Sequence, residues 1–275
     1  MSIFVSIIIP SYKPGIYLKE CLKSISNQTI ASYRYEVLVI LNGCNEPYFS
    51  YIESLTKEIF GEDENIKIVQ TDTPGVSRAR NIGIDEAQGD FITFVDDDDI
   101  VSSTYLEELL RVSSPECIGC SNSYAFVNDI SEKKANFVTP AFEECNGTPF
   151  SLIQYRKFLS APWAKLIHKS IIHGSRFPID MKKSEDSVFC LQISPKIKDM
   201  KLASSDAVYY QRLREGSAMR KKESYWSIIK EHLFIEYKYL SVWIKNPFRY
   251  NLKFLLSRIA ACAKNCMIYI KSQNK

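Results

Sequence analysis

Long hydrophobic runs, a second Cys-x-x-Cys pair and clustered histidines are all missing from this sequence of 275 residues. No stretch approaches the roughly 18 uncharged apolar residues that indicate a transmembrane helix. Residues 3–9 are apolar but end at Pro10, and they lack the basic start and the small-residue cleavage site of a signal peptide. We therefore expect a cytosolic protein without a membrane-spanning helix.

The cysteines and histidines do not predict a zinc site. The eight cysteines are irregularly spaced, and a free cysteine within an apolar pattern behaves as a small hydrophobe. Cys117 and Cys120 have the spacing of half a zinc site, but a structural zinc needs four ligands and no second pair exists. We expect residues 117–127 to form a buried strand, and the three histidines have no metal-like spacing: His168, His173 and His232.

Composition and charge divide the chain into two parts. A hydrophobic content of 45% and a charged content of 24% are typical of a globular protein with one large core. Residues 220–275 contain 12 of the 35 Lys and Arg residues but 3 of the 32 Asp and Glu residues, a balance of +9. The remainder has a balance of −6. We therefore predict a body at 1–219 and a basic, aromatic-rich helical tail at 220–275.

Strands and helices alternate up to residue 100. Short apolar runs predict strands at 5–9, 36–41, 66–69 and 91–95. Amphipathic segments between them predict helices, and the third helix carries small residues such as Ala79 and Gly83 that would let it lie close to the sheet. This alternation predicts an α/β fold with a doubly wound, mostly parallel sheet.

The pattern after residue 100 is less regular. Thr104 and Glu107 have the spacing of a capping box for a helix that reaches Val112. Residues 128–150 look like a loop, and the pattern beyond Ser224 is helical.

Four consecutive aspartates, Asp96 to Asp99, follow the apolar strand at 91–95. Ligands bind at the carboxyl ends of the strands in an open α/β sheet. Gathered carboxylates repel one another unless a cation lies among them, and hard oxygen ligands favour Mg²⁺ or Mn²⁺ shared with substrate phosphates. The alternative is an acidic loop or the first turn of a helix, where the helix dipole favours aspartate.

Several short motifs in order make residues 3–219 resemble glycosyltransferase family 2, which has the nucleotide-diphospho-sugar transferase A-type fold. The motifs are Val5-Ser6-Ile7-Ile8-Ile9-Pro10-Ser11-Tyr12, Gln28-Thr29, Glu36-Val37-Leu38-Val39-Ile40, Gly75-Val76-Ser77-Arg78-Ala79-Arg80-Asn81-Ile82-Gly83, Phe94-Val95-Asp96-Asp97-Asp98-Asp99, Pro162-Trp163-Ala164-Lys165-Leu166 and Ser184-Glu185-Asp186. The resemblance implies a Rossmann-like catalytic domain with a donor half at about 1–100 and an acceptor half at about 101–219.

On the donor side, the resemblance implies that Pro10, Ser11 and Tyr12 border the nucleotide base. It also implies that Arg80 lies near the donor. Arg212 or Arg214 would reach the diphosphate.

The resemblance also assigns the acidic cluster. Asp98 is implied as the direct ligand of a divalent metal, Mg²⁺ or Mn²⁺. Asp96 is the other acid of the metal-binding element, and Asp96 or Asp97 would face the ribose and the sugar.

On the acceptor side, Asp186 matches the position of the catalytic base, with Glu185, Trp163 and Lys165 as acceptor-binding candidates. Three of these residues have a structural alternative. Asp186 could be an exposed acid at a helix N-terminus, Trp163 a core aromatic residue, and Lys165 a solvated charge.

One departure from the family's pattern concerns the base pocket. An aspartate pair usually follows the second strand, where its second member grips uracil, but this chain has Leu41 and Asn42. Asparagine offers both a donor and an acceptor, so Asn42 could still pair with a base edge. A preference for uridine does not follow.

The leading interpretation is an inverting, metal-dependent glycosyltransferase. It would transfer a sugar from a nucleotide-diphosphate sugar to a carbohydrate or lipid-linked acceptor in surface polysaccharide or glycolipid synthesis, without a nucleic acid partner. A nucleotidyltransferase acting on sugar phosphates is a rival, although Ser11-Tyr12-Lys13-Pro14-Gly15 is a poor phosphate loop. A catalytically silent nucleotide-sugar-binding module is a third reading, which the presence of Asp98 and Asp186 disfavours.

The tail suggests a peripheral contact with the inner face of a membrane. It is basic and aromatic, which suits the surface of an anionic bilayer. A helix at 254–271 would place apolar residues on one face and Arg258, Lys264 and Asn265 off it; the apolar residues are Leu255, Leu256, Ile259, Ala263, Met267 and Ile270. The alternative is that this face packs on the catalytic domain or on a second subunit in a homodimer.

Overall fold

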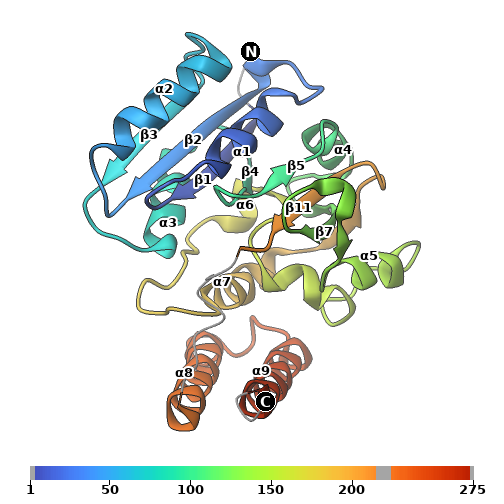
Figure 1. Cartoon of the computed structure of the whole chain (residues 1–275). Coiled ribbons are helices and arrows are strands. Elements are labelled where there is room, and N and C mark those ends of the chain that lie inside the picture. The colour runs from blue at the N-terminus through green and yellow to red at the C-terminus, as the bar shows by residue number, and fades with distance from the viewer. Residues whose placement is uncertain (1–3, 215–223, 273–275) are drawn as a thin grey trace.

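A seven-stranded sheet forms the centre of the molecule in a computed structural model that describes residues 4–214 and 224–272 (Figure 1). The strand order is β10-β6-β9-β4-β1-β2-β3. The strands are β1 (Val5–Ser11), β2 (Tyr35–Asn42), β3 (Ile66–Thr71), β4 (Phe91–Phe94), β6 (Cys117–Cys120), β9 (Lys165–His168) and β10 (Asp199–Leu202).

The sheet is mostly parallel, as the alternation of strands and helices predicts. β1 pairs in parallel with β2 and β4, so that Ile7 lies opposite Val37 and Thr93. β9 pairs antiparallel with both β4 and β6. The carboxyl ends of β1, β2 and β4 therefore meet at one edge of the sheet.

The helices of the first half are α1 (Tyr17–Ser26), α2 (Tyr48–Phe60) and α3 (Val76–Glu86). α1 packs against α2, and α3 packs on β1 and β2. The expected close approach of α3 is present, because a Cβ added to Gly83 would lie 2.3 Å from Cγ2 of Ile8. A short 3-10 helix, η1 (Ser32–Arg34), precedes β2.

A second, four-stranded sheet has the order β5-β11-β7-β8. Its strands are β5 (Ile100–Val101), β7 (Asn122–Phe126), β8 (Lys134–Ala135) and β11 (Val208–Arg212). The expectation of one strand at 117–127 is wrong. The chain leaves the large sheet at Ser121, whose N–H donates to the carbonyl of Ala164, and joins the small sheet at Asn122, opposite Val208.

Two further expectations for this region are wrong. The segment at 128–150 contains the 3-10 helix η2 (Ile130–Glu132), β8 and the helix α5 (Thr139–Cys145), which buries Phe142. Helix α4 (Tyr105–Val112) has no capping box, because the Thr104 hydroxyl donates to the Asp206 carbonyl instead. Both differences come from contacts with distant segments of the chain.

The remaining elements of the body come before and after β9 in the chain. They are η3 (Gln154–Ser160), α6 (Lys169–Ile172), α7 (Glu185–Ile193) and η4 (Ser194–Lys196). Cys117 and Cys120 are free thiols in the buried strand β6, in line with the expected strand.

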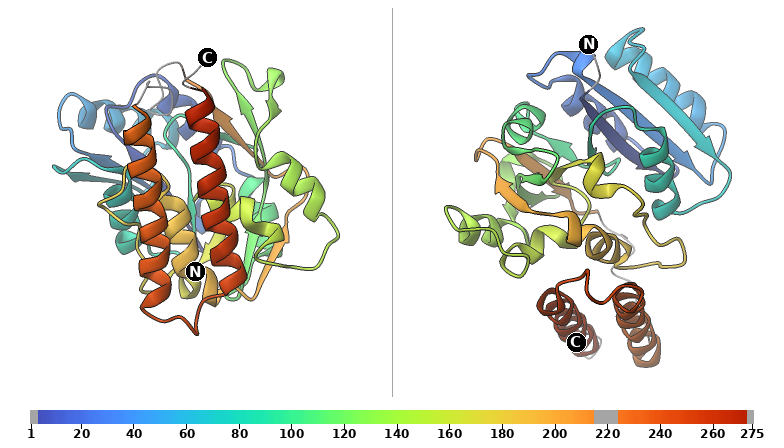
Figure 2. Two further views of the ribbon diagram at one scale, coloured as in Figure 1. Left: turned by 90° about the horizontal axis from the view of Figure 1, so that it is seen from below. Right: turned by 180° about the vertical axis from the view of Figure 1, so that it is seen from behind.

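The C-terminal part is a helical hairpin of α8 (Tyr225–Ile244) and α9 (Leu252–Ser272), as predicted. Figure 2 shows the two helices side by side at the lower end of the molecule, and α8 packs on α7. None of the described helices combines the length and the apolar character that crossing a bilayer requires.

The predicted apolar face of α9 is wrong in detail. The residues that α9 buries are Phe254, Leu255, Arg258 and Cys262, whereas Leu256 and Met267 are exposed. The face was predicted from periodicity alone, and the hairpin turns α9 so that Arg258 faces the body.

Candidate active site

A cavity of about 560 Å³ lies at the carboxyl ends of β1, β2 and β4. The second sheet closes its other side through β11. It is lined by Pro10, Tyr12, Asn42, Pro74, Gly75, Val76, Arg80, Asp96, Asp97, Asp98, Asp99, Gln211, Arg212 and Arg214. The structure thus brings together the donor-side residues of the sequence prediction, apart from Ser11, which is buried directly beneath and bonds to Asp97.

The four aspartates have four different partners. Asp96 pairs with Arg80 at 3.0 Å, and Asp97 accepts a hydrogen bond of 2.7 Å from the Ser11 hydroxyl. Asp98 pairs with the guanidinium of Arg214. The cluster is therefore an organised set of buried and half-buried acids and not a solvated acidic loop.

Asp99 has a role that the sequence did not suggest. Its buried carboxylate accepts hydrogen bonds from the Tyr209 hydroxyl at 2.6 Å and from the backbone N–H of Arg212 at 2.7 Å. Asp99 thereby fixes β11 against the end of β4. This contact positions both arginines of the β11 end at the cavity.

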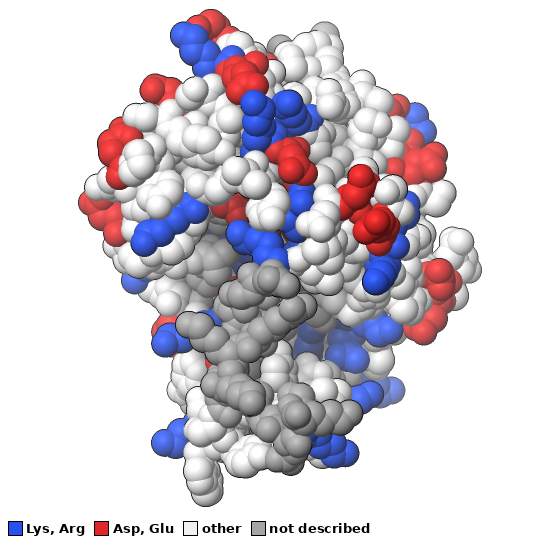
Figure 3. All heavy atoms as spheres, viewed as in Figure 1, with Lys and Arg blue, Asp and Glu red and all other residues white. Residues whose placement is uncertain are grey.

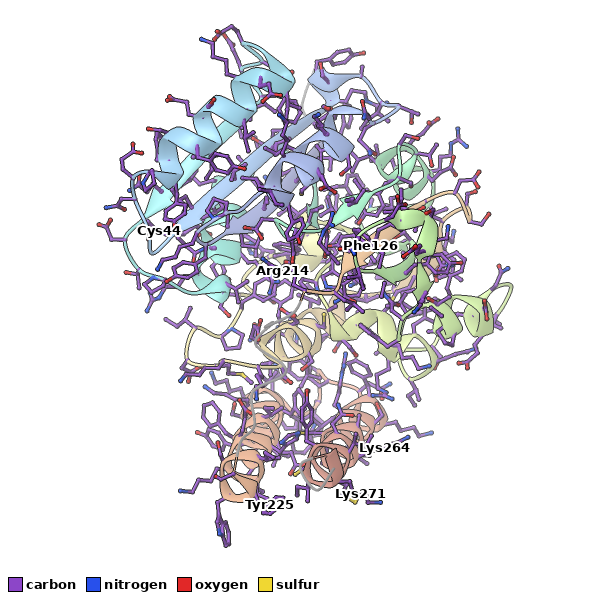
Figure 4. All side chains as sticks on the ribbon, in the orientation of Figure 1. Cys44, Phe126, Arg214, Tyr225, Lys264 and Lys271 are labelled. Carbon is purple, nitrogen blue, oxygen red and sulfur yellow. The ribbon has the colours of Figure 1, made fainter. Side chains whose placement is uncertain are left out.

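The two arginines differ in how many contacts hold their side chains in place. The buried guanidinium of Arg212 lies between the rings of Tyr17 and Phe126, at 4.2 and 4.4 Å from their centroids, and it pairs with Glu20 at 2.6 Å. The Arg214 side chain is 49% exposed and reaches only Asp98 among the described residues. Figure 4 shows Arg214 between the large sheet and the second sheet. Arg214 is therefore the better candidate for a diphosphate ligand.

Arg80 connects the acidic cluster with the predicted catalytic base. Its buried guanidinium bonds to Asp186 Oδ1 at 2.6 Å, to Asp96 Oδ1 at 3.0 Å and to Glu185 Oε1 at 3.4 Å. Burial alone would lower the pKa of Arg80, but these carboxylates raise it above its usual value. Arg80 is thus a permanent cation in the middle of the site.

Asp186 lies in the first turn of α7 and is 21% exposed. Burial raises its pKa to about 7, an effect that Arg80 opposes and Glu185 reinforces. Arg80 occupies Oδ1, and no described residue donates a hydrogen bond to Oδ2. The exposed-acid alternative for Asp186 does not describe this position, because the carboxylate is half-buried and paired with Arg80.

The acids of the cluster also have shifted proton affinities. Burial raises the pKa of Asp97 to about 6, and the neighbouring aspartates add to this while Ser11 opposes it. Burial raises the pKa of Asp99 well above its ordinary value. Asp97 and Asp99 therefore keep their protons to a higher pH than a solvent-exposed aspartate does.

Asn42 joins two loops at the rim of the cavity. Its amide Nδ2 donates to the carbonyl of Ser11 at 2.7 Å, and its Oδ1 accepts from the N–H of Gly75 at 2.9 Å. Gly75 has φ of 140°, a backbone conformation that other residues rarely adopt. Asn42 therefore shapes the pocket through the backbone of its neighbours.

Trp163 and Lys165 lie outside the residues that line the cavity. Trp163 is buried and stacks on Tyr209 with ring centroids 4.9 Å apart. Lys165 is also buried, and its ammonium donates to the carbonyls of Ala161 at 2.5 Å and Trp163 at 2.8 Å. The solvated-charge alternative for Lys165 is wrong, and the core position of Trp163 matches its structural alternative. An acceptor role for either residue stays a prediction.

The donor set fits a divalent metal. Asp96 and Asp98 offer hard carboxylate oxygens at a cavity wide enough for a diphosphate. No three acidic, thiol or imidazole groups converge to hold a metal among the residues that the structure describes. Two carboxylates would therefore supply the protein ligands, and diphosphate oxygens and water the rest, as is usual for Mg²⁺.

Several residues of the site could not be expected from the sequence. Tyr209 and Gln211 carry no motif, and only the folded β11 brings them to the aspartates. Glu20 of α1 also carries no motif, and it joins the site through its ion pair with Arg212. Pro74 and Gly75 were recognisable as a turn dipeptide, but nothing in the sequence indicated that this turn lines the cavity.

Comparison with known proteins points to one family. The family model described as Glycosyl transferase family 2 matches residues 6–171. The putative glycosyltransferase EpsH of Bacillus subtilis is 26% identical over 191 residues, which cover 67% of this chain and 54% of that protein. The poly(ribitol-phosphate) beta-N-acetylglucosaminyltransferase TarS of Staphylococcus aureus is 22% identical over 78% of this chain and 36% of its own length. The chain thus spans about half or less of these relatives.

Solved structures share the fold. S. aureus TarS 1-349 in complex with UDP-GlcNAc has a TM-score of 0.66 at 22% identity and covers 86% of this chain and 67% of its own. The mannosyltransferase PcManGT of Pyrobaculum calidifontis, in complex with GDP-Man and Mn²⁺, has a TM-score of 0.62 at 13% identity and covers 99% of this chain and 75% of its own. These likenesses confirm the predicted fold class.

Proposed function

The chain belongs to glycosyl transferase family 2 and is a glycosyltransferase, and from this premise we propose that it transfers a sugar from a nucleotide-diphosphate donor with inversion at the anomeric carbon. The observation that carries the proposal is the bridge from Asp96 through Arg80 to Asp186. It joins the donor cavity to a carboxylate with a pKa near neutrality. Family membership favours this reading over nucleotidyl transfer.

The first task of the site is to bind the diphosphate. Asp98 and Asp96 would hold the divalent metal, which supplies charge stabilisation for the leaving diphosphate when bound. Arg214 is half-exposed and borders the same cavity, so its guanidinium can bind diphosphate oxygens. The complexes of TarS with UDP-GlcNAc and of PcManGT with GDP-Man and Mn²⁺ support this assignment by analogy of fold.

The second task is to remove a proton from the acceptor hydroxyl. Asp186 Oδ2 accepts no hydrogen bond from a described residue, whereas Arg80 fixes the carboxylate through Oδ1. A base whose pKa lies near the working pH transfers protons efficiently, with a contribution of roughly 10²–10⁴-fold. Attack by the activated hydroxyl on the face opposite the diphosphate inverts the anomeric centre.

The acceptor is a carbohydrate or a lipid-linked carbohydrate in polysaccharide or glycolipid synthesis. The relatives support this class through TarS, which is named for poly(ribitol-phosphate). One relative in Campylobacter jejuni is named for a sugar chain linked to PP-undecaprenol.

The test is release of nucleoside diphosphate from a panel of nucleotide sugars, with and without Mg²⁺ or Mn²⁺. Wild-type protein should turn over at least one donor, and Asp98→Ala should lose the metal-dependent part while staying folded. Asp206→Ala is the matched control, because its exposed side chain lies outside the cavity. Full activity of Asp98→Ala in chelator-treated buffer would contradict the metal assignment, and no turnover of any donor would favour a silent binding module.

A further inference from the structure

A second cavity of about 150 Å³ lies between η3, the first turn of α7 and the C-terminal hairpin. Figure 1 shows how the hairpin lies below α7. The polar lining of this cavity includes Arg156, Arg258, His232, Ser184, Ser187 and Tyr239, and none of the described residues that line it is an aspartate or a glutamate. None of these six belongs to the donor cavity. The cavity is therefore a separate, cationic site.

Arg258 is a buried cation with no counter-ion among the residues that the structure describes. It is 3% exposed and lines the cavity from α9. Its Nη1 donates to the Ser160 hydroxyl at 2.9 Å and its Nη2 to the Leu159 carbonyl, but its buried Nε–H has no partner. No described carboxylate pairs with it. Because burying an unpaired charge is costly, an anion bound beside the guanidinium of Arg258 would stabilise the folded protein.

Two more side chains of the cavity, those of Arg156 and His232, can bind an anion. Arg156 is half-buried and its guanidinium forms no ion pair with a described residue. The Nδ1–H of His232 donates to the Ile228 carbonyl at 2.8 Å, so Nε2 can donate to an anion in the imidazolium form of the ring. The hydroxyls of Ser187 and Tyr239 are 2.6 Å apart and join α7 to α8 at the cavity wall.

The cavity adjoins the proposed catalytic base. Ser184 and Ser187 line it from the first turn of α7, and Asp186 of the same turn points to Arg80 and the donor cavity. One turn of an α-helix rises about 5.4 Å. Two residues that line the second cavity, Ser184 and Ser187, thus lie within one helical turn of the residue that would activate the acceptor.

We propose that this cavity binds a phosphate or diphosphate group carried by the acceptor substrate. The inference rests on the proposed function, because it assigns the acceptor side of the same reaction. Arginine guanidinium groups match phosphate oxygens geometrically. The cavity of about 150 Å³ has room for such a group, because it is several times larger than the roughly 30 Å³ that one water molecule takes up in the liquid. The phosphate could belong to a polyprenyl diphosphate or to a polyol phosphate, and the experiment separates the two.

The first experiment measures binding of inorganic pyrophosphate to the full chain by calorimetry, without any donor. Three variants are compared with the wild type: Arg156→Gln in this cavity, Arg214→Gln in the donor cavity and Arg249→Gln, which removes an exposed charge elsewhere on the hairpin. We expect binding that survives Arg214→Gln and Arg249→Gln but weakens about tenfold or more in Arg156→Gln, the scale of one hydrogen bond to a charged group. Equal affinity of Arg156→Gln and wild type would overturn the proposal.

The second experiment measures transfer with a polyprenyl-diphosphate-linked sugar, a polyol phosphate and their phosphate-free counterparts. Arg156→Gln should raise the KM of the phosphate-bearing acceptor about tenfold or more, leaving the KM of the donor unchanged. The acceptor that shows this effect identifies the source of the phosphate. Unchanged acceptor KM would overturn the proposal, whereas absence of turnover in every protein would contradict the proposed function and leave the calorimetry to decide on the site.

Discussion

At the scale of single residues, the Asp186–Arg80 pair determines how the site handles protons. A carboxylate with a pKa of about 7 is half protonated near neutral pH, because burial outweighs the attraction of Arg80. Only the deprotonated form can act as a base. With Asp186 as the proposed base, the rate should therefore fall as the pH drops through about 7, the opposite direction from a site that needs a protonated acid.

Asp186→Asn tests this role. The amide keeps the size of the side chain but cannot accept the proton, so kcat should fall about 10²-fold or more with little change in the KM of the donor. The limb of kcat/KM near pH 7 should disappear in the variant. Steady-state kinetics from pH 5.5 to 8.5, a range of about three units around that pKa, provides both readouts. A change confined to the KM of the donor would make Asp186 a binding residue.

Asn42 shapes the part of the cavity where we expect the nucleotide base, through two backbone contacts. In Asn42→Asp the carboxylate cannot donate to the Ser11 carbonyl, although it can still accept from Gly75. Loss of the buried hydrogen bond should cost about 1–3 kcal/mol of unfolding free energy. Relative rates with uridine, guanosine and thymidine donors should also change. Identical relative rates in the two proteins would mean that Asn42 does not affect the choice of base.

At the scale of elements, the close packing of α3 on β1 positions Arg80. Gly83 faces Ile8 so closely that any Cβ would overlap its side chain. Arg80 lies one helical turn before Gly83 on the same helix. A shift of α3 away from the sheet would therefore move the guanidinium that links Asp96 and Asp186.

Gly83→Val should destabilise the protein by about 1–3 kcal/mol, the usual cost of overpacking a core. It should also lower activity, because Arg80 moves with α3. Denaturant unfolding and transfer assays check the two effects. Gly15→Val is the control, since a Cβ at Gly15 meets nothing within 4 Å, and it should change stability by less than about 0.5 kcal/mol. A wild-type midpoint for Gly83→Val would show that α3 relaxes freely.

The elements that could be predicted from the sequence are those whose own residues form an apolar run or a helical periodicity. β1, β2, β3 and β4 follow from apolar runs, and α1 buries Leu18, Cys21, Leu22 and Ile25 as its periodicity indicates. The split of residues 117–127 was not predictable, because pairing with distant segments decides it. The same holds for the site, since Asp99 meets Tyr209 across 110 positions of the chain.

At the scale of the whole molecule, the C-terminal hairpin combines a buried face with an exposed apolar and basic face. The large exposed apolar residues of the hairpin include Trp226, Leu233, Tyr237, Ile244 and Phe248. Exposed lysines accompany them, and Figure 4 shows Lys264 and Lys271 on α9 and Tyr225 at the lower end of α8. Blue side chains also appear on the hairpin in Figure 3. Packing of the hairpin on the catalytic domain accounts for the buried face but not for the exposed one.

We propose that the exposed face of the hairpin binds an anionic bilayer, where each basic residue near the surface contributes roughly 1 kcal/mol. Binding should rise with the content of anionic lipid and fall with salt in vesicle flotation. A triple variant, Trp226→Ser, Ile244→Ser and Phe248→Ser, should weaken binding at least about tenfold, because burying each large apolar side chain contributes about 1.5–3 kcal/mol.

The triple variant replaces residues that are 66–100% exposed, so the packing of the hairpin on α7 stays intact. Tyr33→Ser is the matched control, because Tyr33 is an exposed aromatic residue on η1. η1 adjoins the N-terminal end of the chain, where the Phe4 N–H donates to the Arg34 carbonyl, and Figure 1 shows this end of the chain far from the hairpin. It should float like the wild type. Equal flotation of the triple variant and the wild type would contradict the membrane assignment. A wild-type dimer that the triple variant loses in analytical ultracentrifugation would instead assign this face to a second subunit, since a bilayer contact does not depend on self-association.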